Sequence, residues 1–192
     1  MFYYNKAMSI LTTTIPFLPS PIRGSISLVI APRQAIESLT TMLVSLALNG
    51  QVTLVDGGNL FDGYRLTRML RMQTTSIRQT LDNICLSRVF TCYQMVALLK
   101  DLPADGPPVI IFDLFATYLD ESVSFSRRRE LLATSLSELQ RINTISPIAL
   151  WVRLRSVPSG EDKQLLTPVL EIAQDIWQFE SPRSLSPQLS LF

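Results

Sequence analysis

The chain has 192 residues, of which 47% are hydrophobic and 17% charged, so it is long enough and apolar enough to bury a sizeable core. Its 17 basic and 16 acidic side chains give a net charge of +1, which argues against a strongly basic nucleic-acid-binding domain. The sequence has no histidine, which excludes histidine general bases, Ser-His-Asp and Cys-His nucleophiles, and histidine metal sites.

Residues 1–23 are predicted to form an N-terminal arm. Pro16, Pro19 and Pro21 favour extended or turn backbone and disfavour a long helix. The arm packs either on the chain's own core or on a neighbouring subunit. It is a poor signal peptide, and the chain lacks the run of about 20 apolar residues that a membrane span needs. We therefore expect a soluble, cytoplasmic protein that does not bind membranes.

The next segment predicts a strand–helix–strand unit. Residues 25–30 form a short, apolar, β-branched run that is typical of a strand buried in a parallel sheet. Apolar residues then recur at helical spacing over 36–48, and a second strand is predicted over 51–55. Such a unit predicts a parallel pair of strands with a right-handed crossover.

The loop between the first strand and its helix has the place and length of a phosphate-binding loop, G-x-x-x-x-G-K-[ST]. Ala31 and Ile36 stand at the two glycine positions of this motif. Neither residue has the backbone freedom of glycine. Glu37 stands at the lysine position, where its charge repels a phosphate, whereas Ser38 keeps the last hydroxyl position. The sequence predicts a loop that has stopped binding nucleotide.

The middle of the chain predicts a helix over 64–72, a short strand or turn over 80–84, and an apolar helix over 85–99. That helix would contain Cys85 and Cys92, which we expect to be small buried residues rather than a disulfide or metal pair. A loop rich in proline, glycine and aspartate follows over 101–108.

A strong apolar strand is predicted over 109–112, and it ends at Asp113. This pattern is typical of the carboxylate that holds the magnesium of a bound nucleotide. A helix over 127–142 then begins with Arg127, Arg128 and Arg129, whose charges oppose the helix dipole. These arginines indicate either a partner outside the helix or a solvated basic patch.

The C-terminal third predicts a strand over 148–154, a polar loop over 156–164 and a final strand pair within 169–179. From residue 180 onward the chain is rich in serine and proline, which is typical of a flexible tail.

In this order the segments resemble the ATPase core of RecA/RadA-type recombinases and their paralogues. The matching stretches are G-S-I-S at 24–27, V-D-G-G-N at 55–59, L-D-N-I at 81–84 with Arg88 and Phe90 after it, V-I-I-F-D at 109–113, and the helix after 128. The resemblance implies an α/β fold with a RecA-like, mostly parallel sheet flanked by helices. It implies a core over 24–180, between the arm at 1–23 and a tail at 181–192.

The departures from this family bear on activity. The family's water-activating glutamate falls on Gly58, and its phosphate-binding lysine falls on Glu37. Of the family's residues that contact magnesium, only the counterparts Ser38 and Asp113 are retained. We therefore expect no ATP hydrolysis, no cofactor and no metal site.

The family's second DNA-binding loop corresponds to 156–164 and is shortened here. Single-stranded DNA would then be contacted by scattered basic side chains, whose charges can pair with phosphates. These candidates are Arg127, Arg128, Arg129, Arg153, Arg155 and Lys163.

The last five residues, Gln188, Leu189, Ser190, Leu191 and Phe192, resemble the Q-L-[SD]-L-F peptide by which bacterial polymerases and repair proteins dock on the sliding clamp. A tail that folds back on its own core is the alternative. The resemblances together imply a non-catalytic accessory protein of DNA repair, recombination or translesion synthesis, with another RecA-like subunit or a repair polymerase as a further partner. A recombinase paralogue that binds single-stranded DNA and assists filament assembly is the other interpretation.

Overall fold

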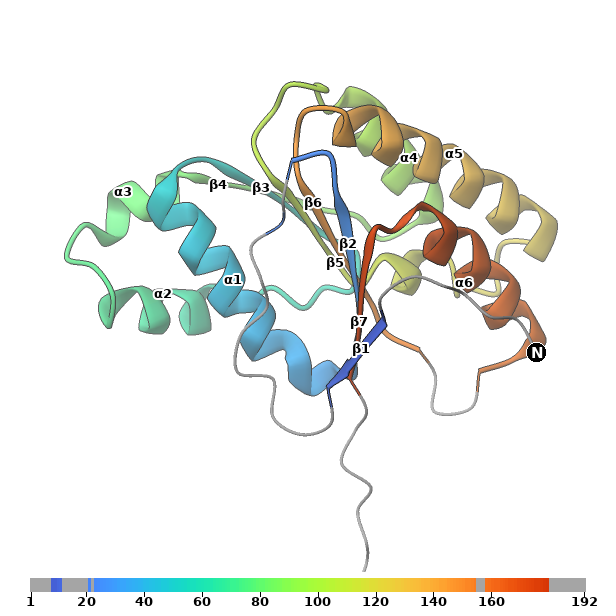
Figure 1. The fold of residues 1–192 in the computed structure, drawn as a ribbon, viewed down its shortest axis with the longest axis horizontal. Coiled ribbons are helices and arrows are strands. Elements are labelled where there is room, and N and C mark those ends of the chain that lie inside the picture. The colour runs from blue at the N-terminus through green and yellow to red at the C-terminus, as the bar shows by residue number, and fades with distance from the viewer. Residues whose placement is uncertain (1–7, 12–20, 22, 155–157, 180–192) are drawn as a thin grey trace, which may run out of the picture.

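The computed structural model describes residues 8–11, 21, 23–154 and 158–179, and within them the fold is α/β. A seven-stranded sheet has the order β1-β7-β2-β6-β5-β3-β4, and every neighbouring pair is parallel (Figure 1). The strands are β1 (Met8–Leu11), β2 (Ile26–Ile30), β3 (Val52–Asp56), β4 (Ile84–Arg88), β5 (Val109–Phe112), β6 (Ile148–Val152) and β7 (Asp175–Phe179). The expected α/β class with a mostly parallel sheet is confirmed.

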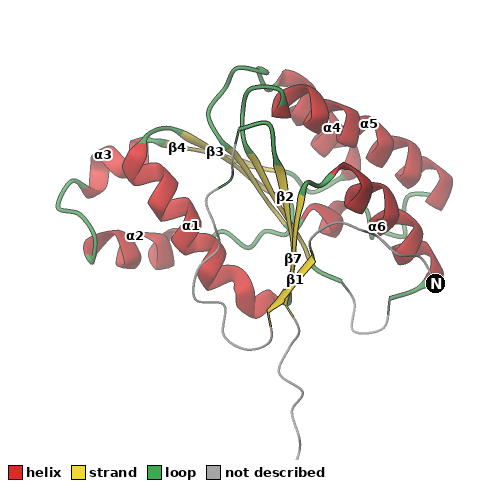
Figure 2. Cartoon of the chain, in the orientation of Figure 1, coloured by secondary structure: helices red, strands yellow, loops and turns green. Residues whose placement is uncertain are grey.

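Helices cover both faces of this sheet (Figures 1 and 2). One layer holds α1 (Ile36–Asn49), α2 (Gly63–Arg71) and α3 (Ile77–Asp82), and the other holds α4 (Cys92–Asp101), α5 (Phe125–Asn143) and α6 (Gly160–Ile172). Strands β2, β3, β5 and β6 are buried along their whole length, because a parallel sheet covered on both sides has no wet face. Within the described residues, no helix combines the length and the apolar composition that crossing a membrane requires.

The described part of the arm joins the sheet of its own chain, because β1 pairs with β7 along Met8–Leu11. The strands β2 and β3 are parallel as predicted, but they are not neighbours. Strands β6 and β5 lie between them.

The predicted helix over 85–99 is wrong in its first half. Residues Ile84–Arg88 form the edge strand β4, and α4 begins only at Cys92. The predicted strand or turn over 80–84 is mostly the end of α3. Pairing with the backbone of β3 decides this segment, since tertiary context overrides a short apolar period. Consequently Cys92 is buried as expected, whereas Cys85 is exposed, and both are free thiols.

The predicted loop over 156–164 is also largely wrong. Ser159 caps α6, and a reciprocal capping box with Asp162 starts the helix at Gly160. The predicted final strand pair is instead the end of α6 followed by the single strand β7. Residues 155–157 and the tail from residue 180 lie outside the described residues.

Candidate functional site at the carboxyl ends of the strands

The sheet topology indicates where a ligand site would lie. Strand β2 leads into α1 on one face, whereas its neighbour β6 leads into α6 on the other. Strands β3 and β5 diverge in the same way, toward α2 and α5. Open parallel sheets bind ligands outside the carboxyl ends of strands at such switch points. The candidate site therefore consists of the residues that follow these four strands, among them Ala31, Gly58, Asp113 and Arg153.

The loop after β2 begins with a residue whose two backbone groups both bond to the neighbouring strand β6. The Ala31 N–H donates to the carbonyl of Val152 at 3.2 Å, and the Ala31 carbonyl accepts from Trp151 Nε1 at 3.0 Å. Pro32 has no N–H, and its carbonyl accepts from Ala35 at 3.0 Å in a 3₁₀ turn. A phosphate-binding loop needs several outward N–H groups, which glycines with left-handed backbone help to present. No residue from 31 to 36, a stretch that the structure describes in full, has a positive φ.

The first turn of α1 holds the other predicted residues of the degenerate loop. Ile36 is half-buried against the core beneath α1. Glu37 is exposed in the first turn, where its carboxylate complements the positive end of the helix dipole. Ser38 is half-buried and has a polar interaction of its own. A negative side chain thus stands at the helix end where a phosphate would otherwise be favoured.

The loop after β3 leaves no room for a side chain at Gly58. A Cβ atom built there would lie 2.8 Å from the Cβ of Asp113 and 2.8 Å from a methyl group of Leu60. A Cβ at Gly57 would lie 2.9 Å from the carbonyl oxygen of Asp113. The two loops after β3 and β5 are therefore in direct contact, and a glutamate at Gly58 does not fit this arrangement.

Asp113 forms an ion pair with Arg153 across the ends of β5 and β6. Oδ2 of Asp113 lies 2.8 Å from Nη2 of Arg153, and the Arg153 N–H donates to Oδ1 at 3.3 Å. Asp113 is 1% exposed and has left-handed backbone, with φ of 52°. Burial raises the pKa of this carboxyl above its ordinary value, and the charge of Arg153 acts in the opposite direction. A guanidinium thus neutralises the carboxylate whose place in the sequence is typical of a magnesium-binding residue.

Asp56 is a second buried carboxylate, whose role the sequence analysis missed. It is fully buried and accepts the backbone N–H groups of Leu60 and Phe61, each at 2.9 Å. Arg88 Nε lies 3.4 Å from the same carboxylate, and its Nη2 donates to the Phe61 carbonyl at 3.0 Å. Asp56 and Arg88 therefore fix the loop that leads into α2. The turn-forming residues after Asp56 were the signal available in the sequence.

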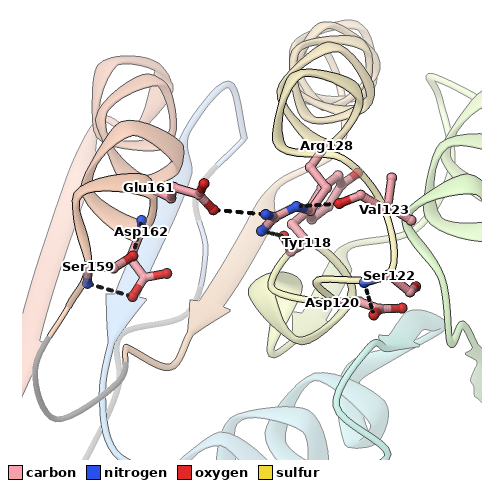
Figure 3. Close-up of polar contacts among 8 residues, drawn as sticks. All are labelled: Tyr118, Asp120, Ser122, Val123, Arg128, Ser159, Glu161 and Asp162. Atoms are coloured by element: carbon pink, nitrogen blue, oxygen red, sulfur yellow. Dashed lines mark hydrogen bonds and ion pairs between the residues drawn. The ribbon is translucent and has the colours of Figure 1, made fainter.

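Arg128 does not present its charge to solvent, contrary to its selection as a candidate DNA contact (Figure 3). It is 4% exposed, and its guanidinium donates to the carbonyls of Tyr118 at 3.1 Å and Val123 at 3.0 Å. A third contact, at 2.8 Å, reaches Glu161 on α6. Arg128 therefore joins α5 to α6 and to the loop before α5, and it is a structural residue.

The other candidate basic residues that the structure describes have separate partners or lie on separate elements. Arg127 pairs with Glu130 at 2.9 Å and lies 5.6 Å from the ring centre of Tyr93. Arg129 lies over the ring of Phe125, and Lys163 is exposed on α6. Arg153 is paired with Asp113 at the carboxyl ends of β5 and β6. Arg155 and the clamp-binding peptide at 188–192 lie outside the described residues.

Two open grooves lie beside α5. One, of about 660 Å³, runs between α5 and α6, and the other, of about 380 Å³, runs between α4 and α5. Acidic and basic side chains line both, with Glu130 facing each of them. Among the described residues, no group of three or more aspartate, glutamate or cysteine side chains is placed to hold a metal ion.

No protein-family model matches this chain, and no curated protein matches it.

Proposed function

We propose that this chain is a non-catalytic, RecA-like accessory protein of DNA repair, recombination or translesion synthesis. It bridges partner proteins and docks on the sliding clamp through residues 188–192. The observation that supports the non-catalytic part is the arrangement at the carboxyl ends of the strands. There Asp113 is paired with Arg153, and Gly58 packs against Asp113 without space for a side chain.

Nucleotide hydrolysis needs a phosphate cradle, a cation site and a group that orients water. The Ala31 N–H is used in a bond to β6 and Pro32 has no N–H, Asp113 is paired with Arg153, and Gly58 has no space for a carboxylate side chain. These three observations support the non-catalytic proposal independently of one another. A single substitution, such as Glu37→Lys, is therefore not expected to create ATPase activity.

The clamp-docking part of the proposal rests on the sequence of the tail. Leucine and a terminal phenylalanine suit an apolar pocket, and a glutamine amide can form hydrogen bonds beside it. Capture by a partner requires a peptide that can leave its own domain, and a Ser/Pro-rich tether supplies the necessary reach.

Replacing Leu191 and Phe192 with alanine is expected to weaken binding of purified bacterial sliding clamp at least tenfold, because these side chains would fill the pocket. Replacing Leu185 with alanine, in the same tail but outside the motif, is the matched control and should leave binding unchanged. Surface plasmon resonance with immobilised clamp measures both. Equal binding by all the variants, or no binding by the unaltered chain, would contradict clamp docking. It would favour the alternative that the tail packs on its own core.

The second candidate function is binding of single-stranded DNA by a recombinase paralogue. The contact of Arg127 with the ring of Tyr93 favours it, since arginines beside exposed aromatic rings can serve both phosphates and bases. For this function, replacing Arg127 and Arg129 with glutamine should weaken binding of an oligo-dT strand and reduce its salt dependence by about two ionic contacts. A salt slope that does not change would exclude these arginines as the DNA contacts.

A further inference from the structure

The solvent-facing side of α2 has an unusual composition. The helix buries Leu66 and Leu70 against the core, and helical periodicity then places Tyr64, Arg68 and Arg71 together on the opposite side. Tyr64 is 79% exposed, and Met72, directly after the helix, is 83% exposed. These are the two most exposed large hydrophobic side chains of the described residues.

Positive charge is concentrated on the same segment. Between Gly63 and Leu81 the chain has four of its 17 basic residues and none of its 16 acidic ones, so the remainder has 13 basic and 16 acidic residues. The ion pairs found among the described residues engage other arginines, at positions 88, 127, 128, 141 and 153. Like charges three residues apart on a helix repel one another. An anionic partner would remove this repulsion.

The segment is held in one geometry before any partner arrives. Asp62 caps α2 by accepting the N–H groups of Tyr64 at 2.9 Å and Arg65 at 3.2 Å. Helix α3 contacts both α1 and α2, and Figure 1 shows α2 and α3 at the outer side of their layer, away from α4, α5 and α6. A preformed surface loses little conformational entropy on binding.

We propose that the α2–α3 face docks an acidic segment of a partner protein. This face consists of Tyr64, Arg68, Arg71 and Met72, and the exposed Arg78 lies on the contacting helix α3. Guanidinium groups bind carboxylates through two parallel hydrogen bonds, while the tyrosine ring and the methionine provide apolar contact. Tyrosine, methionine and arginine are enriched in protein–protein interfaces, whereas lysine, aspartate and glutamate are depleted there. The proposal goes beyond clamp docking, because it involves a different surface and a different partner chemistry.

The shape of this face favours a protein over a nucleic acid. Proteins that bind single strands combine a positively charged groove along the backbone with a series of aromatic rings for successive bases. The α2–α3 face is the outside of a helix with one aromatic ring, Tyr64. Both grooves described above are lined by residues of other helices.

The test measures fluorescence anisotropy of a short labelled peptide in which aspartate and glutamate alternate with leucine and phenylalanine. The full chain should bind this peptide, and should not bind a version in which lysine replaces the acidic residues. Reversing the charge at Arg68 and Arg71 with glutamate should weaken binding about tenfold or more. The matched control makes the same charge change at Arg127 and Arg129 on α5, and should retain at least half the affinity.

The proposal would be overturned by no binding of the acidic peptide, by equal loss in the two charge-reversed variants, or by no preference for the acidic peptide over the basic one. Tighter binding of an oligo-dT strand that the α2 variant abolishes would assign the face to single-stranded nucleic acid and would also overturn it. Thermal denaturation shows whether each variant is folded. The sliding clamp is absent from this assay, so failure of clamp docking is measured separately.

Discussion

Replacing Arg128 with alanine is expected to destabilise the fold by about 2–4 kcal/mol, a large part of the stability of a typical domain. The substitution leaves the carbonyls of Tyr118 and Val123 without their charged donor in a buried position. Loss of the contact with Glu161 adds little, because that side chain is half exposed and solvent screens the pair. Urea denaturation measures the change in the free energy of unfolding.

Two other variants sharpen this measurement. Arg129→Ala, one residue further along α5 and exposed, should change stability by less than about 0.5 kcal/mol. Arg128→Lys should lower the free energy of unfolding by an amount between those of the two alanine variants. One ammonium group cannot reach three acceptors in the geometry of a guanidinium. Equal urea midpoints for the alanine variants at 128 and 129 would contradict the structural role of Arg128.

This result also affects how DNA binding is tested. A variant that lacks all three arginines at 127–129 combines a large loss of stability with the loss of exposed charges, so weaker DNA binding by this variant would not assign the DNA contacts. Only Arg127 and Arg129 can be replaced without that ambiguity.

Replacing Arg153 with methionine is expected to cost about 3 kcal/mol at pH 7, because it leaves the buried Asp113 carboxylate without its partner. The pKa of Asp113 in the folded protein is already above its ordinary value of 3.8, and loss of Arg153 raises it further. The folded state then binds the proton more tightly than the unfolded chain does. Stability is therefore retained below pH 3.8 and falls as the pH rises through the pKa of the folded state.

The measurement is urea denaturation of the Arg153→Met variant and the unaltered chain at several pH values between about 4 and 7. The difference in stability should shrink toward the acidic end. Adding Asp113→Asn should restore most of the loss at pH 7, since asparagine removes the charge and tolerates the left-handed backbone at this position. A loss that is independent of pH, or that asparagine does not relieve, would contradict the role of the ion pair.

The sequence predicts the buried strands well, because strands covered on both faces are continuous apolar runs. The predicted strand over 109–112 agrees with β5 in full, and the helix predicted over 36–48 agrees with α1 to within one residue. The helix predicted over 85–99 failed because a strand followed by a helix can place apolar residues at the same spacing. The loop predicted over 156–164 was wrong for another reason. Ser159 and Asp162 form a capping box that starts a helix, and this signal was not recognised in the sequence.

Some features of the candidate site could be predicted from the sequence, and others could not. The positions of Gly58 and Asp113 at the ends of strands follow from local patterns. The pairing of Asp113 with Arg153 depends on β5 and β6 lying side by side, which is a contact between distant segments. The burial of Arg128 likewise depends on the approach of α6, which contributes Glu161. Asp113 and Arg128 therefore each have a partner in a distant segment, which local patterns do not reveal.

The order of the strands has a consequence for synthesis on the ribosome. Leu28 of β2 lies opposite Leu150 of β6 and Ile176 of β7, so both neighbours of this strand are made long after the strand itself. Strands β3, β4 and β5 can pair with one another much earlier, since they lie close together in the sequence. The first strand of the core therefore waits with unpaired backbone groups until residue 179 has emerged. A chain released before that point exposes a whole apolar strand and is a substrate for chaperones or aggregation.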